Sequence, residues 1–280
     1  MSYNKTMKYL IFGFLTASFM ITTLFPFYFA FITSFKTDRE LYNLQMNPLW
    51  ISQGWTLEHY QYLFFKTNFK HWLLNSITVS IIVTIYSTTV STLAAYALTR
   101  LSFKGSSLVA IAIMLCYLVP PTLLFIPLAF VVSLFKLTNT IWSLVLTYPS
   151  FTIPLETWLL MNYFSTIPKD IEESAMIDGA TRPQVLLKIV LPVAAPGLAT
   201  AALFGFSQCW AQFIYPAAFI TFSPNKVLSV GVPVELVKGD VFYWGPLMAG
   251  TVAAALPVVL VYLIFTRYFV AGLTAGAVKM

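Results

Sequence analysis

The sequence has little charge, few cysteines and few histidines. Only 9% of its 280 residues are charged, whereas 59% are hydrophobic. A soluble domain needs many more charged residues to cover its surface. Several stretches run about 20 residues with almost no charge, the length needed to cross the ~30 Å hydrocarbon core of a bilayer. We therefore expect an all-α, polytopic membrane protein.

The scarce residue types also exclude functions. Cys116 and Cys209 both fall inside apolar stretches, which favours small core residues over a disulfide or a metal pair. His59 and His71 flank one polar loop without ligand spacing, and the sequence contains no GxxxxGK[ST] phosphate loop. We expect no catalytic residue, metal or cofactor in this chain. The net charge of +6 indicates anchoring at the membrane surface and not nucleic-acid binding.

Hydropathy predicts six spans in one transmembrane domain covering residues 1–280. Their approximate bounds are 9–33, 72–98, 108–132, 141–163, 193–219 and 246–270. The second span is rich in Ser, Thr and Ala, which suits close helix packing. The third contains Pro120, Pro121 and Pro127, which break the backbone hydrogen-bond ladder, so the freed carbonyl groups must face protein or a water-filled cavity.

The distribution of Lys and Arg predicts the orientation. With six spans and the N-terminus inside, inner segments hold nine basic residues and outer segments seven, four of them in the long segment from Lys36 to Lys70. Without that segment the count is nine against three. The positive-inside rule then places both termini in the cytoplasm. In the segment between Lys36 and His71, residues 57–65 read as a short amphipathic helix, either an interfacial aromatic element or a docking surface for an outer partner.

A polar segment, residues 164–192, separates the fourth and fifth predicted spans. Pro168 suits the first position of a helix, and acidic residues in the first turn complement the helix dipole. Gly179 suits the C-terminal end of that helix. The acidic residues are Asp170, Glu172 and Glu173, and the predicted apolar face is Ile171, Ala175 and Ile177.

A second short helix is predicted directly after this glycine. Thr181 and Gln184 have the spacing of a capping box, a helix is expected over 184–189, and Pro192 leads into the fifth span. The segment is either a capped interfacial loop without a partner or a rigid elbow presented to a soluble protein.

The spacing in this elbow resembles the EAA loop of membrane subunits of ATP-binding cassette importers, whose pattern is Glu-Ala-Ala-x3-Gly-x9-Ile-x-Leu-Pro. The pattern is matched at six positions and departs only at Ser174. The matching residues are Glu173, Ala175, Gly179, Ile189, Leu191 and Pro192. Four further segments resemble the carbohydrate-uptake branch of this family, most closely the smaller, six-span subunit of maltose-type permeases. They are 33–36, Asn75-Ser76, 177–180 and 267–279.

This resemblance implies a fold, partners and a mechanism. A short elbow would sit in a cleft of an ATPase and carry its movement to the bundle. The implied coupling residues are Glu172, Glu173, Ser174, Ala175, Asp178, Gly179 and Ala180. The implied partners are a second homologous permease subunit, two ATPase subunits that bind ATP and Mg, a periplasmic or extracellular solute-binding protein, and membrane lipid. The location would be a bacterial or archaeal cytoplasmic membrane. The tail from Gly272 to Met280 would contact the ATPases or fray.

Polar residues inside the predicted spans are candidates for the substrate path. Glu156 should face the bundle interior or an aqueous cavity. It either lines that cavity and bonds the solute, pairs with a backbone amide freed by Pro154, or lies near the cytoplasmic interface. Gln208 and Gln212 would share a helix face beside Trp210, for solute recognition or interhelical hydrogen bonds. The family resemblance has Trp-Asn-acidic-Phe at residues 210–213, from which Ala211 and Gln212 depart. Asn75 is a further candidate, with packing as its alternative role.

Two other functional classes compete with the importer subunit. A secondary, ion-coupled transporter would need inverted repeats and midplane ion sites, and we find no repeat. An intramembrane enzyme would need paired catalytic groups at membrane depth, which neither histidine provides.

Overall fold

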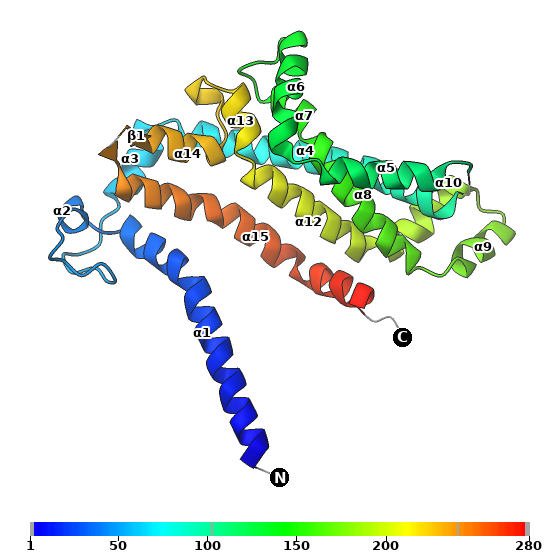
Figure 1. The fold of residues 1–280 in the computed structure, drawn as a ribbon, viewed down its shortest axis with the longest axis horizontal. Coiled ribbons are helices and arrows are strands. Elements are labelled where there is room, and N and C mark those ends of the chain that lie inside the picture. The colour runs from blue at the N-terminus through cyan, green and yellow to red at the C-terminus, as the bar shows by residue number, and fades with distance from the viewer. Residues whose placement is uncertain (1–2, 102, 240, 278–280) are drawn as a thin grey trace. The chain divides into compact units, whose positions relative to one another are not determined.

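The computed structural model describes the backbone of residues 3–101, 103–239 and 241–277, and the side chains of 7–101, 103–239 and 241–266. The regular secondary structure of these residues is almost entirely helical (Figure 1). In the described part of the chain, the strands are β1 (Val237–Lys238) and β2 (Val241–Phe242), which pair antiparallel. The chain divides into two compact units: unit 1 holds Met1–Lys70 and Gly231–Leu256, and unit 2 holds His71–Val230 and Pro257–Met280.

Unit 1 begins with a long apolar helix. It contains α1 (Tyr3–Ser34), α2 (Asp38–Leu41), α3 (Glu58–Lys66), most of α14 (Leu228–Leu236), the two strands and the first part of α15 (Trp244–Ala277). From residue 7 to residue 28 every side chain of α1 is exposed in the chain alone. Figure 1 shows the N-terminal part of α1 extending away from α2 and α3. A helix that is hydrophobic on all sides requires lipid or protein around it.

Buried polar groups hold the predicted outer segment together. The Lys36 ammonium donates to the carbonyl of Asn47 at 2.7 Å and lies 3.3 Å from the Glu40 carboxylate. Burial acts to raise the pKa of Glu40, but hydrogen bonds from the Ser52 and Gln53 amides and the Lys36 charge lower this pKa overall. The amphipathic helix predicted over 57–65 is confirmed as α3, which buries His59 and Leu63.

Unit 2 contains the remaining helices. They are α4 (Phe69–Arg100), α5 (Ser106–Leu118), α6 (Pro121–Leu134), α7 (Trp142–Thr147), α8 (Pro149–Ser165), α9 (Asp170–Ile177), α10 (Arg182–Val185), the π-helical η1 (Leu186–Val190), α11 (Leu191–Val193), α12 (Ala195–Ala211), α13 (Ile214–Phe219), the 3₁₀ turn η2 (Ser223–Asn225) and the end of α15. One apolar cluster gathers around Tyr148, Phe151 and Tyr215, and a second around Tyr96 and Phe164.

The close packing expected for the second span is present between α4 and α8. Ser87 and Thr152 share a hydrogen bond of 2.7 Å, and the Ser91 hydroxyl donates to the carbonyl of Ile153 at 3.1 Å. Ser87 and Ser91 lie one turn apart and are fully buried. Small hydroxyl side chains therefore let these two helices approach closely while their polar atoms find partners.

Three helices in the described residues are long and apolar enough to cross a membrane. They are Met7–Ser34, Phe69–Arg100 and Trp244–Thr266, which correspond to the first, second and sixth predicted spans. Two bent helix pairs could add two more: α5 with α6, bent by 97°, and Arg182–Val193 with α12, bent by 78°. The predicted number of six spans therefore stays a prediction.

The other predicted spans are not continuous helices. The third breaks into α5 and α6 at Val119 and Pro120, as its prolines predicted. The fourth is divided between α7 and α8, with Pro149 as the first residue of α8. The fifth ends earlier than predicted, because α12 stops at Ala211 and α13 is a separate helix.

Candidate coupling site and substrate path

The first helix of the candidate coupling segment, α9, begins two residues later than predicted. Asp170, and not Pro168, is its first residue, and the amides of Glu172 and Glu173 donate to the carbonyl of Lys169. The Ile167 carbonyl, which an earlier helix start would use internally, instead accepts a bond from the Arg100 guanidinium at 2.8 Å. The acidic first turn is confirmed.

The predicted apolar face of α9 is wrong. Ile171 is 43% exposed and Ile177 85% exposed, whereas Glu172 is only 5% exposed. Ala175 is partly buried and packs against the apolar cluster around Phe164. The side chain of α9 that points inward is thus the Glu172 carboxylate, because it forms an ion pair with a buried cation.

That cation is Arg100, the last residue of α4. Its Nε donates to Glu172 Oε1 at 2.6 Å, and its Nη2 donates to the carbonyls of Phe164 at 2.9 Å and Ile167 at 2.8 Å. The Tyr96 hydroxyl donates to the second oxygen of Glu172 at 3.2 Å. Both oxygens of the carboxylate are therefore bonded to side chains of α4.

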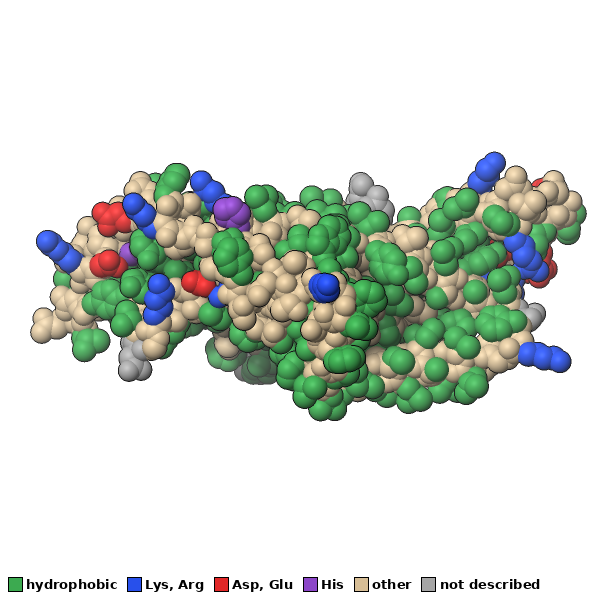
Figure 2. All heavy atoms as spheres, turned by 90° about the horizontal axis from the view of Figure 1, so that it is seen from above, with side chains coloured by type: hydrophobic (Ala, Val, Ile, Leu, Met, Phe, Trp, Pro, Cys, Tyr) green, Lys and Arg blue, Asp and Glu red, His purple; other side chains and the backbone are tan. Residues whose placement is uncertain are grey.

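The remaining coupling candidates lie toward the surface. Glu173, Ser174 and Asp178 are exposed, as is Gly179, and Ala180 is partly buried. In Figure 2 charged side chains gather at the end of unit 2 that carries α9 and α10, while hydrophobic side chains cover most of the rest of this unit. The helix thus offers solvent a mixed face of acidic and apolar side chains.

Gly179 ends α9 as predicted. Its φ is +91°, in the left-handed region that glycine adopts at no steric cost. The amide of Gly179 donates to the carbonyl of Met176 at 3.1 Å, and that of Ala180 to the carbonyl of Ala175 at 3.0 Å. The second bond is the long closing bond of a Schellman motif.

The second half of the elbow follows a confirmed cap. The Thr181 amide donates to Gln184 Oε1 at 2.8 Å, in the capping box that opens α10. The helix predicted over 184–189 is instead two pieces, α10 and η1. Pro192 lies in α11, just before the 78° bend at Ala194.

Glu156 faces the interior of unit 2, as predicted. It is fully buried on α8, and neither carboxylate oxygen has a hydrogen-bond partner among the described residues. An interaction with the Thr88 hydroxyl falls short of hydrogen-bond geometry. A Cβ at Gly205 of α12 would lie 1.9 Å from Oε1. Glu156 thus bonds to no backbone amide in the described structure, and its contact with solute stays a prediction.

Gln208 and Gln212 do not share a helix face. Gln212 is the extended residue that follows α12, because its Oε1 accepts the amide of Ile214 at 3.1 Å and its carbonyl accepts the Ser229 hydroxyl at 2.6 Å. Trp210 stacks on Phe206, with ring centroids 5.5 Å apart. A role for these three residues in the substrate path stays a prediction.

Asn75 holds two segments of unit 2 together. Its side-chain amide donates to the carbonyls of Pro224 and Lys226, both at 3.0 Å. The nearby Ser76 hydroxyl accepts the Leu228 amide at 2.8 Å. These contacts support the packing role for Asn75.

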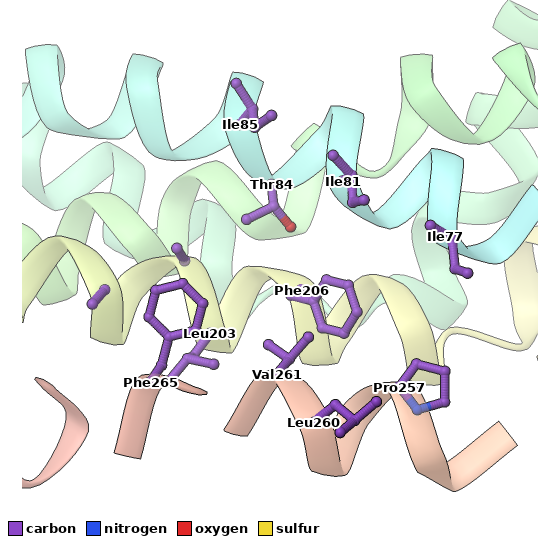
Figure 3. A pocket seen from close by; sticks show the side chains of 12 residues that line it. Ile77, Ile81, Thr84, Ile85, Leu203, Phe206, Pro257, Leu260, Val261 and Phe265 are labelled. Atoms are coloured by element: carbon purple, nitrogen blue, oxygen red, sulfur yellow. The ribbon is translucent and has the colours of Figure 1, made fainter. Parts of the chain in front are cut away.

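An apolar groove of about 510 Å³ lies on unit 2 between α4, α12 and α15 (Figure 3). Ile81 and Thr84 of α4, Phe206 of α12 and Val261 of α15 are among the side chains that line it. None of the candidate substrate residues belongs to this lining. Its nearly complete lack of polar groups suits hydrocarbon and not a hydroxylated solute.

A match between the sequence and a family model identifies the kind of protein that has this structure. Residues 87–275 match the model described as the inner membrane component of binding-protein-dependent transport systems. The chain belongs to this family. It is a membrane permease of ATP-binding cassette transport, as the EAA-like spacing indicated.

Two curated relatives of this permease cover nearly the whole chain. It is 35% identical over 265 residues to the inner membrane ABC transporter permease protein YcjP of Escherichia coli, covering 94% of each protein. It is 36% identical over 262 residues to the trehalose/maltose transport system permease protein MalG of Thermococcus litoralis, covering 92% of each.

The fold of the permease also matches a solved structure. The match is to a chain in the crystal structure of a bacterial ABC transporter involved in the import of the acidic polysaccharide alginate, with a TM-score of 0.81. It covers 95% of this chain and 98% of that chain, at 19% sequence identity. At that identity the likeness supports the helical fold alone.

Sequence reasoning missed three residues of the permease that the geometry makes important. Arg100 contributed only to the count of basic residues, because its partner Glu172 lies 72 positions away in the sequence. Tyr96 and Gly205 gave no signal, because an apolar helix uses tyrosine and glycine in many ways.

Proposed function

We propose that this chain is the permease subunit of an ATP-driven carbohydrate importer, and that α9 receives the movement of its ATPase. The main support for this role is that α9 has one buried and one exposed face. Glu172 is held inside by Arg100, while Glu173 in the first turn and Ile177 at the end that Gly179 closes both face solvent. An exposed leucine-sized residue beside an acid on a fixed helix suits a protein cleft with a basic wall.

The partners and the solute belong to this proposal. The family's description as binding-protein-dependent supports a solute-binding protein as one partner. ATP and Mg would be bound by two ATPase subunits, and a second permease subunit would complete the path. A carbohydrate solute is supported by the trehalose/maltose system of one relative. Both termini and α9 would lie in the cytoplasm. The candidate tail, Gly272 to Met280, falls on residues whose side chains the structure does not describe.

Cross-linking tests the assignment of α9. A photo-reactive cross-linker at Ile177→Cys, in a Cys116→Ser background that removes the exposed native thiol, should capture an ATPase subunit from the purified complex. Leu44→Cys in the predicted outer segment is the matched control and should not, although residue 44 is also highly exposed. Capture at residue 44 instead of 177 would contradict both the role of α9 and the orientation.

Uptake by proteoliposomes tests the function. The complex with its binding protein should accumulate labelled maltooligosaccharide only when ATP and Mg are supplied on the ATPase side. Glu173→Lys should reduce uptake, whereas Asp38→Lys, which changes an exposed acid of the outer segment, should leave ATP-driven uptake in place. Uptake driven by a proton or sodium gradient without nucleotide would overturn the proposal.

A further inference from the structure

The Arg100 guanidinium joins three separate elements of unit 2. Its own position ends α4, its Nη2 bonds the carbonyls of Phe164 in α8 and Ile167 just after α8, and its Nε bonds Glu172 in α9. The side chains of Arg100 and Glu172 are only 5% and 7% exposed. A planar guanidinium spreads its donors over a rigid fork that reaches three separate acceptors, whereas an ammonium carries its donors on a single nitrogen.

Tyr96 strengthens the same junction from one turn earlier on α4. Its hydroxyl donates to Glu172 at 3.2 Å, and its ring packs edge-on against Phe164, with centroids 6.4 Å apart. The Glu172 carboxylate is therefore hydrogen-bonded by two residues of α4 that are four positions apart and lie on the same helix face. Both hydrogen bonds are buried and shielded from salt.

The two chain segments that connect α9 to its neighbours are not helical and would transmit a displacement of α9 poorly. The chain enters α9 through the non-helical residues 166–169 and leaves it through the left-handed Gly179. An isolated helix of eight residues is not stable by itself, and Ile171 and Ile177 contribute little burial. A displacement of α9 would bend these connections unless a tertiary contact carried it onward.

We propose that Arg100 is a positioning residue for energy coupling, which makes α9, the end of α8 and α4 move as one body. The inference rests on the proposed function, since α9 must receive a push for this link to matter. It assigns to α4 the task of carrying the movement into the membrane, because α4 is a single unbroken helix from Phe69 to Arg100. Glu172 is thereby an internal anchor, and the contact with the ATPase falls to Glu173 and its exposed neighbours.

The functional test compares transport per ATP hydrolysed in reconstituted complexes. Arg100→Gln should lower this ratio about 10-fold, within the usual range of coupling between sites, while the ATPase still turns over. Arg100→Lys should give a ratio between those of the native and the Arg100→Gln complexes, because lysine keeps the charge but not the rigid fork of donors. Lys104→Gln, an exposed basic residue of the following turn, is the control and should match the native ratio.

A double variant distinguishes a pair from two independent sites. Glu172→Gln should lower the ratio as Arg100→Gln does, and the double variant should be no worse than the poorer single one. Losses that multiply, or a native ratio in Arg100→Gln, would overturn the proposal.

A structural readout separates this inference from the function itself. Spin labels at exposed Thr89→Cys on α4 and Ile177→Cys on α9, in the Cys116→Ser chain, should give a narrow distance distribution that broadens in Arg100→Gln. The measurement uses the full chain and needs no ATPase, so it also applies where a variant fails to assemble. An unchanged distribution would refute the anchor even if uptake is ATP-driven; absent ATP-driven uptake with a broadened distribution would refute only the function.

Discussion

Glu172 and Glu156 are both buried in unit 2, but their surroundings are opposite. Glu172 lies at the polar end, where Arg100 and Tyr96 bond both of its oxygens. Glu156 lies in the middle of α8, where neither oxygen has a hydrogen-bond partner among the described residues and the space beside it exists because residue 205 is glycine.

The difference shows two ways in which a helical bundle accommodates a carboxyl group. A buried carboxylate that is bonded by a cation and by a hydroxyl group fixes the position of the segment that carries it, although the pair adds little net stability. A buried carboxyl group without partners fixes nothing, and its cost must be offset elsewhere in the packing. The first kind serves as an anchor, and the second kind is where a proton, water or solute group would find a free oxygen.

The largest expected difference comes from the same substitution at both positions. Glu172→Gln leaves the Arg100 charge buried without a counter-charge, so the free energy of unfolding should fall by about 3–5 kcal/mol. Glu156→Gln removes no ion pair and preserves shape, so the change should stay within about 1 kcal/mol. Unfolding of the purified chain in mixed micelles, followed by circular dichroism, measures both.

The two variants control for each other because the chemical change is identical. Equal losses at the two positions would mean that Glu156 has an ionic partner that the geometry does not reveal, or that the Arg100 pair is weak. Either result would remove the distinction between anchor and unpartnered group.

A smaller effect is expected from filling the space beside Glu156. Gly205→Ala places a methyl group where the Glu156 carboxylate lies, so the backbone or that side chain must shift, at a cost of about 1–3 kcal/mol. Glu156→Ala should remove most of this penalty when the two are combined. Gly13→Ala in α1, where nothing lies within 4 Å, is the matched control and should not destabilise.

The double variant Gly205→Ala/Glu156→Ala tests whether the two residues compete for the same space. If Gly205→Ala costs as much in the Glu156→Ala chain as in the native chain, the carboxylate does not occupy the space and the two residues are independent. Thermal unfolding of the four chains in one detergent is sufficient.

Local chemistry along the chain could be predicted, and long-range partnership could not. The end of α9 at Gly179, the capping box at Thr181 and the proline break between α5 and α6 depend on neighbours in sequence, and all three are confirmed. The helix start at Pro168 and the apolar face of α9 were wrong for one reason. Arg100, 72 positions away from Glu172, takes the Ile167 carbonyl and the Glu172 carboxylate.

The same limit applies to the substrate path. The face shared by Gln208 and Gln212 assumed a continuous helix, but Gln212 bonds the Ile214 amide and Ser229 bonds the Gln212 carbonyl. Such local hydrogen bonds between side chain and backbone compete with the backbone hydrogen bonds of a helix and leave no mark in the hydrophobic pattern of the sequence. The coupling role of Glu173 and Gly179 and the solute contacts of Glu156 and Trp210 remain predictions.

The smallest expected effect concerns Gly179, which ends the anchored helix through backbone conformation and not through a partner. Its φ of +91° strains any residue with a Cβ, yet a Cβ there would meet nothing within 4 Å. Gly179→Ala should therefore cost about 1–2 kcal/mol, and Gly179→Asn less, because asparagine tolerates this conformation better. Hydrogen exchange of the α9 amides should speed up in the order native, Asn, Ala. Equal exchange in the Asn and Ala variants would show that the turn relaxes freely, leaving Arg100 as the constraint on α9 at this end.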